Sequence, residues 1–369
     1  MPPKKPKKAT PTRKPSHFFK KQLAGEQAPS LASMEDLLRL AGGFADLEPW
    51  KARSDADLVM VPALDNQLCF CSVMGALGEV FALQVYIGLE GYRFFQRVSS
   101  GLIRSSGDFF AGQRGVSVEF VQLKELTAPD RELLKALGHP LRRGTFAPLF
   151  RANRPGYHPW YITEAEANLL RCCLQAEIAL LDALSKQPDL PLWDRENAFP
   201  AVRHIPVKGH PGRYEIRVED VPPEPKSSPV LPVLDERKLN ATLARQLPMN
   251  GVFEIDRFYG NAVIGGPNQR KACMRVALVV DANSGLVFPP LVESPSLPVG
   301  DMLVKALYTA IEAAGATPAA VQVVNPEFKV LLAPFAAALG FRVELADSLP
   351  ALEPARQSLL SFIGGEGPL

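Results

Sequence analysis

A proline-rich segment, Val221 to Val233 (VPPEPKSSPVLPV), limits most strongly how this chain can fold. It contains five prolines and two serines in 13 positions. Proline lacks a backbone N–H and fixes φ, so this segment fits neither a helix interior nor a central strand. The whole chain has 35 prolines in 369 residues, close to twice the usual share of about 5%, which excludes coiled coils and helical solenoids. We therefore expect a semi-rigid linker between two domains.

The linker divides the chain into four predicted parts. Residues 1–29 are expected to form a disordered basic tail, 30–220 a domain of the α+β class, 221–233 the linker, and 234–369 an α/β domain with a mixed sheet. The apolar and charged shares, 47% and 22%, are typical of a globular protein. No run approaches the ~20 apolar residues that span a bilayer, and the five cysteines include no Cys-x-x-Cys pair. These features predict a cytoplasmic protein without membrane contact or disulfides.

Positive charge is concentrated at the N-terminus. Met1 to Lys21 hold eight basic residues and no acidic one, which leaves 33 basic against 39 acidic residues in the remainder. Such a tail could neutralise the phosphates of nucleic acid, or it could be a solubilising segment without a specific partner. Both interpretations remain open. The basic residues concerned are Lys4, Lys5, Lys7, Lys8, Arg13, Lys14, Lys20 and Lys21.

The N-terminal domain is predicted to combine short strands and helices in the order β-β-α-β-α. A first helix over residues 31–41 is expected to end at Gly42 and Gly43, because glycine commonly terminates helices. Cys69 and Cys71 are two apart on a predicted strand, so both should point to one face. With no histidine nearby in the sequence, buried core thiols are favoured over a metal site.

The segment Arg142 to Trp160 (RRGTFAPLFRANRPGYHPW) is predicted to be irregular, basic and aromatic. Guanidinium groups beside flat rings suit single-stranded nucleic acid, where they contact phosphates while the rings stack on bases. The alternative, which we favour, is an extended segment whose rings fill the core and whose arginines are solvated. The nucleic-acid-binding candidates here are Arg142, Arg143, Arg151, Arg154 and Trp160.

The C-terminal domain is predicted to begin with a helix at 234–247 and to continue in the order β-β-β-α-β-α-β-α. Its parallel crossover connections fit a mixed sheet covered by helices. The strands are expected at 252–260, 274–281, 286–293, 320–325 and 341–345, and the helices at 301–314, 327–340 and 353–362.

Two strings of the sequence resemble known but uncharacterised domains. CSVMGALGEVFALQVYIGLEGY, from Cys71 to Tyr92, is similar to the signature of an uncharacterised bacterial domain family. LPALEPARQSLLSF is similar to the C-terminal end of a second uncharacterised domain that often accompanies the first. The resemblance covers most of the chain after the tail. It implies no activity, so no catalytic residues follow from it.

The order of elements in the C-terminal domain resembles the ribonuclease H-like fold of retroviral integrases and transposases. In that superfamily, carboxylates on the first strand, after the fourth strand and on the last helix hold two divalent metals for phosphodiester cleavage. The resemblance matches Asp256, Asn325 and Glu353 to these positions. Asparagine offers one neutral amide oxygen, so Mg²⁺ binding should weaken greatly. Glu327 could substitute for the missing carboxylate from the next turn.

The leading hypothesis is a non-catalytic binding module with a degenerate active site and no metal or cofactor, whose partner is nucleic acid or another protein. The alternative is a metal-dependent nuclease or strand-transfer enzyme in which Asp256, Glu327 and Glu353 bind Mg²⁺. The enzyme requires these carboxylates to converge within a few Å, whereas the binding module allows them to be separate. The sequence contains no phosphate-binding loop, dinucleotide fingerprint, nucleophile elbow or His-Glu-x-x-His motif.

Overall fold

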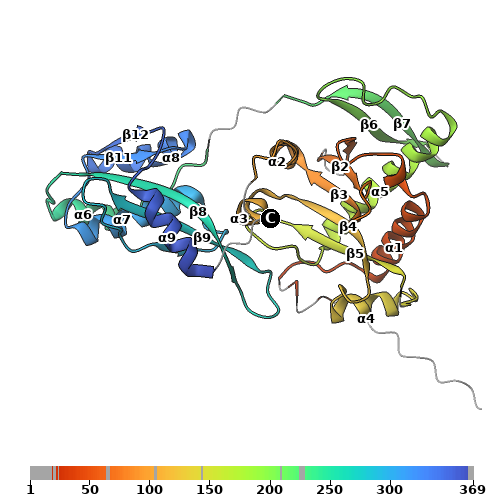
Figure 1. Cartoon of the computed structure of the whole chain (residues 1–369), viewed down its shortest axis with the longest axis horizontal. Coiled ribbons are helices and arrows are strands. Elements are labelled where there is room, and N and C mark those ends of the chain that lie inside the picture. Colours follow the sequence, from red (N-terminus) through yellow and green to blue (C-terminus); the bar gives the residue numbers. More distant parts are fainter. Residues whose placement is uncertain are drawn as a thin grey trace, which may run out of the picture.

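The computed structural model contains two mixed α/β regions, each built on its own mixed sheet (Figure 1). It describes residues 19, 22–23, 25–63, 67–103, 106–142, 144–207, 210–223 and 229–364. The eight basic residues of the predicted tail lie outside this part of the chain. Within it, no helix has the length and apolar character needed to cross a membrane. The prediction of two regions that each combine helices with a sheet is confirmed.

Seven strands form the N-terminal sheet in the order β5-β4-β3-β2-β1-β6-β7. Neighbouring strands are antiparallel, except for β1 and β6, which are parallel. The strands are β1 (Val59–Pro62), β2 (Leu68–Met74), β3 (Phe81–Ile87), β4 (Gly115–Gln122), β5 (Phe146–Asn153), β6 (Ala198–Val207) and β7 (His210–Asp220).

Helices cover both faces of this sheet. On one face, α1 (Leu31–Asp46) and α5 (Glu164–Lys186) pack together over a core that includes Cys69 and Cys71. On the other, α2 (Gly88–Ser99) and α3 (Ser106–Gly112) lie over a smaller apolar cluster. Successive strand residues enter different cores because their side chains point to opposite faces. The two thiols do share one face, as predicted, and both are buried.

Helix α1 continues through Gly42 and Gly43, so the predicted stop at these glycines is wrong. Phe44 lies beyond them and is completely buried in the core. Glycine in a helix interior costs about 1 kcal/mol relative to alanine. Burial of a phenylalanine side chain contributes more than that, roughly 1.5–3 kcal/mol, and therefore keeps the last turn helical.

The described residues between 19 and 29 differ from the predicted disordered tail, because they pack on the N-terminal domain. Phe19 and Leu23 are buried in the main core. The ring of Phe19 stacks on Tyr161 with a centroid distance of 4.8 Å. The Gln27 carbonyl accepts a hydrogen bond from the N–H of Glu164 at the start of α5. Phe19 inside the basic run and Leu23 just after it thus provide the burial that orders this stretch.

Residues Phe146–Asn153 form strand β5, so the prediction that Arg142 to Trp160 is irregular throughout is wrong. β5 pairs with β4 along its whole length, from Gly115 opposite Asn153 to Gln122 opposite Phe146. Pro148 lies within this strand. Proline is tolerated there because β5 is at the edge of the sheet.

Five strands form the C-terminal sheet in the order β10-β9-β8-β11-β12. The element order of this region is the predicted one. β8 pairs antiparallel with β9 and parallel with β11, β9 pairs antiparallel with β10, and β11 pairs parallel with β12. The elements are α6 (Glu236–Ala244), β8 (Val252–Ile264), β9 (Ala272–Asp281), β10 (Leu291–Glu293), α7 (Val299–Ala314), β11 (Ala320–Val323), α8 (Pro326–Leu339), β12 (Arg342–Leu345) and α9 (Leu352–Gly364).

The helices of this region divide between the two faces of the sheet. α7 and α8 share one apolar core with Phe253 and Ile255 of β8. α9 packs on the opposite face, against Phe258 of the same strand. This division follows from the alternation of side chains along β8.

The two regions also meet directly, beyond the linker. The hairpin of β8 and β9 reaches the segment that follows β5 (Figure 1). The N–H of Cys273 donates to the Gly156 carbonyl at 2.8 Å, and the N–H of His158 donates to the Lys271 carbonyl at 2.9 Å. Gly156 has φ +81°, and a Cβ at this residue would lie 2.5 Å from Pro295. Glycine therefore permits this close approach.

Candidate functional site

The C-terminal sheet brings together two of the three predicted carboxylates. Asp256 lies on β8 beneath α9, and Glu353 lies in the first turn of α9. Arg356 is close to both, with its Nη1 3.7 Å from Asp256 Oδ2 and 3.7 Å from Glu353 Oε2. Its guanidinium also lies over the ring of Phe258. Burial raises the pKa of Asp256, while the N–H of Arg257 and the charge of Arg356 act in the opposite direction.

Asn325 and Glu327 have a different role, at the start of α8. The Oδ1 of Asn325 accepts a hydrogen bond from the N–H of Glu327 at 2.9 Å and so caps the helix. Glu327 is exposed, and α8 packs on the face of the sheet opposite α9. Among the described residues, no group of three His, Cys, Asp or Glu side chains is arranged to hold a metal. The three carboxylates of the nuclease hypothesis are therefore not brought together.

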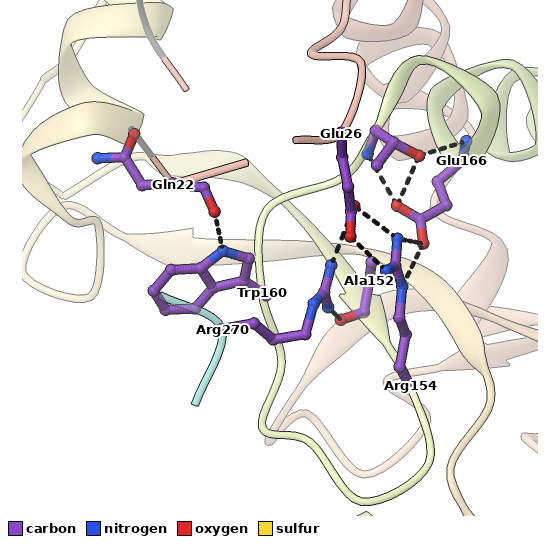
Figure 2. Close-up of polar contacts among 8 residues, drawn as sticks. Gln22, Glu26, Ala152, Arg154, Trp160, Glu166 and Arg270 are labelled. Atoms are coloured by element: carbon purple, nitrogen blue, oxygen red, sulfur yellow. Dashed lines mark hydrogen bonds and ion pairs between the residues drawn. The ribbon is translucent and has the colours of Figure 1, made fainter. Parts of the chain in front are cut away.

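Arg154, a candidate for nucleic-acid binding, is held in an ion-pair cluster (Figure 2). Its Nη1 lies 2.7 Å from Glu26 Oε1, and its Nη2 lies 2.9 Å from Glu166 Oε1. Arg270 reaches the same cluster from the C-terminal region, donating to the Ala152 carbonyl at 3.3 Å and lying 4.0 Å from Glu26. The two carboxylates balance the charge that Arg154 would offer to a phosphate.

The other candidates of this segment are also mostly engaged inside the protein. Arg151 Nη2 lies 2.6 Å from Asp130 Oδ2, and its guanidinium lies over the Tyr161 ring. Trp160 donates through Nε1 to the Gln22 carbonyl at 2.7 Å (Figure 2). The prediction that the arginines of this segment are solvated is thus wrong for Arg151 and Arg154. Arg142 is exposed, and Arg143 lies outside the described residues.

A pocket of about 420 Å³ lies on the face of the N-terminal sheet that carries α2 and α3. Sites for small molecules typically measure roughly 300–1,000 Å³, so one small organic molecule fits this volume. Its aromatic walls come from β3, α2 and α3. The rings are those of Tyr86, Phe95, Phe109 and Phe110.

Polar side chains from the middle of the sheet form the floor of the pocket. Ser72 on β2 lies opposite Gln84 on β3, and Gln84 lies opposite Ser117 on β4. All three are buried, with exposed fractions of 1%, 6% and 1%. Ser72 and Gln84 line the pocket directly. Burying such groups costs free energy unless hydrogen bonds replace those made with water.

Some of these polar groups form good hydrogen bonds within the protein, whereas others form long ones or leave an atom without a partner. Ser72 Oγ donates to the Asp55 carbonyl at 2.7 Å. Gln84 Nε2 makes a long hydrogen bond, 3.3 Å, to the carbonyl of the adjacent Val85. Asn153, also in the pocket wall, is 5% exposed, and its Oδ1 has no hydrogen-bond partner in the described part of the chain. An unpaired buried acceptor costs about 1–3 kcal/mol, which a donor supplied by a ligand would offset.

The charged side chains that line the pocket in the described structure are Asp55 and Glu119, both acidic. Burial raises the pKa of Glu119, while the hydrogen bond from Ser117 and the charge of Arg151 lower it. Burial, together with the charge of Asp55, raises the pKa of Tyr86 to about 12, so its hydroxyl stays neutral. A half-buried carboxylate whose pKa is shifted, in a pocket, is typical of functional sites.

Gly115, the first residue of β4, provides the space for this floor. A Cβ at Gly115 would lie 2.0 Å from the Val85 carbonyl oxygen and 2.9 Å from Gln84 Nε2. Glycine therefore lets β3 and β4 approach closely and leaves room for the Gln84 amide.

This pocket was not predicted from the sequence, although a signal was present. In β4, the apolar residues Val116, Val118 and Phe120 alternate with Ser117 and Glu119. Such alternation usually means that the polar face meets solvent. Only the packing of α2 and α3 on that face shows that it is covered.

Two regions of the chain match family models. Residues 35–201 are similar to a Domain of unknown function (DUF7309), and residues 240–360 are similar to a second Domain of unknown function (DUF6930). No curated protein and no solved structure matches the chain. The two matches lie on either side of the proline-rich segment and support a two-domain protein of an uncharacterised family.

Proposed function

We propose that this two-domain protein acts by binding, and that the pocket of the N-terminal sheet holds a small organic molecule. The observation that supports this proposal is the combination of aromatic walls with buried polar groups on strands β2, β3, β4 and β5. Pockets with a few converging polar groups and a carboxylate of shifted pKa are the usual form of small-molecule sites. A sheet face that served only as core would carry apolar side chains here.

The C-terminal region, in our proposal, has a ribonuclease H-like fold with a degenerate metal site. The support for this fold is the order of strands and helices, on which the resemblance rests. The support for degeneracy is Arg356, whose guanidinium lies between the carboxylates of Asp256 and Glu353. A fixed cation at this point balances the charge that a divalent metal would otherwise balance.

The small-molecule site can be tested by filling it. The side chain of Val98 lines the pocket from α2, whereas the adjacent Arg97 is exposed and is not among the lining residues. We expect fragments from a library of small aromatic compounds to raise the melting temperature of the full chain. Val98→Trp should abolish these shifts, and Arg97→Trp should preserve them. Equal shifts in both variants would rule out this pocket as the site.

Nucleic-acid binding through the basic tail stays a prediction, since the tail lies outside the described residues. A truncation that tests it must end before Phe19, because Phe19 and Leu23 belong to the core. We expect the affinity for single-stranded DNA, measured across a salt series, to be lost without residues 1–18 and to fall steeply with salt in the full chain. Unchanged binding by the truncated chain would contradict a role of the tail.

A further inference from the structure

We propose that the ligand of the pocket is an organic cation, an amine, amidine or guanidine attached to an aromatic body. This inference rests on the proposed small-molecule function of the same pocket. Three independent features support it: the sign of the charge in the lining, the aromatic walls, and the unpaired acceptor in the wall.

The charge in the pocket is negative. Asp55 and Glu119 line it, and no Lys, Arg or His does so within the described residues. Arg151 acts on Glu119 from β5, but two hydrogen bonds tie its guanidinium to Asp130, Nη1 to Oδ1 at 3.0 Å and Nη2 to Oδ2 at 2.6 Å. The charge of Arg151 is therefore balanced by Asp130. A ligand cation would supply the missing counter-charge for Glu119, whereas an anion would be repelled.

The aromatic walls of the pocket also favour a cationic ligand. An aromatic ring carries negative charge on its face, so an ammonium or guanidinium group within about 6 Å of the ring centroid is attracted to it. Rings from three elements line the pocket, with Tyr86 on β3, Phe95 on α2, and Phe109 and Phe110 on α3. These rings also pack well against the aromatic body of a ligand.

The unpaired acceptor shows which hydrogen-bonding group is missing. Asn153 Oδ1 is buried and accepts no hydrogen bond in the described structure. The carboxylate of Glu119 in the same lining also accepts and cannot donate while it is ionised. Protonated amines, amidines and guanidines are donors without acceptors, so their N–H groups complement this lining.

Three probes that share one ring and differ in charge test the inference. We would titrate the full chain with benzamidine, benzamide and benzoate by calorimetry. Benzamidine should bind at least ten-fold more tightly than benzamide, and benzoate should not bind. Glu119→Gln should weaken benzamidine at least ten-fold. As a control, Asp182→Asn removes an exposed acid on α5, the helix on the opposite face of the sheet, and should change nothing.

The outcomes separate this inference from the proposed function. Equal affinity for benzamide and benzamidine would overturn the proposal of a cationic ligand, and so would benzamidine binding that Glu119→Gln leaves unchanged. Either result would leave the proposed small-molecule pocket standing. Binding of none of the three probes would also overturn the proposal of a cationic ligand. The comparison of Val98→Trp with Arg97→Trp would still test, independently, whether the pocket binds small molecules.

Discussion

Glu119 is a single residue that the fold keeps at a cost in stability. Because burial raises the pKa of its carboxyl above the ordinary value of 4.5, the folded chain binds more protons here than the unfolded chain in the window between the two values. The contribution of Glu119 to the free energy of unfolding therefore falls as pH rises through this window and is constant above it. A residue that lowers stability in this way is commonly retained for function.

The raised pKa of Glu119 predicts how Glu119→Gln changes stability. The variant has no carboxyl to ionise, so we expect its free energy of unfolding at pH 7 to exceed that of the original chain. The difference should disappear well below pH 4.5, where Glu119 is protonated in both the folded and the unfolded state. Urea unfolding at a series of pH values measures it, with Asp182→Asn as the exposed control. A difference that does not change with pH would contradict the shifted pKa.

Gly115 provides the second prediction for a single residue. Its Cβ would meet a backbone carbonyl oxygen at 2.0 Å, which no side-chain rotation can relieve. We expect Gly115→Ala to lower the free energy of unfolding by about 1–3 kcal/mol. Gly43→Ala is the matched control, because Gly43 lies in α1 with open space around it and should gain about 0.5–1 kcal/mol. A neutral Gly115→Ala would show that the strands are further apart than described.

At the level of elements, the sequence predicts what depends on local pattern. The strands and helices of the C-terminal region have clear periodicity and turn signals, and their order is confirmed. β5 was missed because Pro148 and the surrounding arginines resemble a loop, and only its place at the sheet edge makes this strand possible. The floor of the pocket was missed for a related reason. Ser72, Gln84 and Ser117 come from three strands, and their alignment depends on a pairing register that no local pattern specifies.

Helix α9 illustrates how a buried side chain can position a whole element. Glu254 on β8 is 1% exposed, and its Oε2 accepts a hydrogen bond from the N–H of Leu352 at 2.7 Å, at the first residue of α9. The N–H groups of a first helical turn have no partner within the helix. A negative charge at this end also interacts favourably with the helix dipole. Glu254 therefore fixes the start of the helix that carries Glu353 and Arg356.

We expect Glu254→Ala to lower the free energy of unfolding by about 1–3 kcal/mol, because it leaves a buried N–H unpaired. Hydrogen exchange should become faster for the amides of α9 and remain unchanged in α7, which lies on the other face of the sheet. Glu254→Gln keeps an acceptor oxygen and should show a smaller effect on both measurements. Equal losses in the two variants would assign the effect to the charge of the carboxylate and not to its acceptor oxygen or its packing.

At the scale of the whole molecule, the pocket and the contact between the two regions share one wall. α3 supplies Phe109 and Phe110 to the pocket, while a Cβ at its Gly107 would lie 3.0 Å from Cβ of Tyr259 on β8. The Phe110 carbonyl accepts a hydrogen bond from Gly156, whose own carbonyl accepts one from Cys273 of the C-terminal region. Support for this wall of the pocket thus comes from the other region.

Loosening the contact between the two regions should therefore weaken ligand binding in the pocket. In Gly156→Val, the new side chain would collide with Pro295, so we expect the two regions to separate, with a larger radius of gyration in X-ray scattering. The affinity for benzamidine should fall several-fold as α3 loses its support. Gly144→Val is the matched control, because Gly144 has a similar φ, +84°, with no atoms within 4 Å of its Cβ, and so reports backbone strain alone. Separated regions with unchanged affinity would show that the N-terminal region forms the pocket by itself.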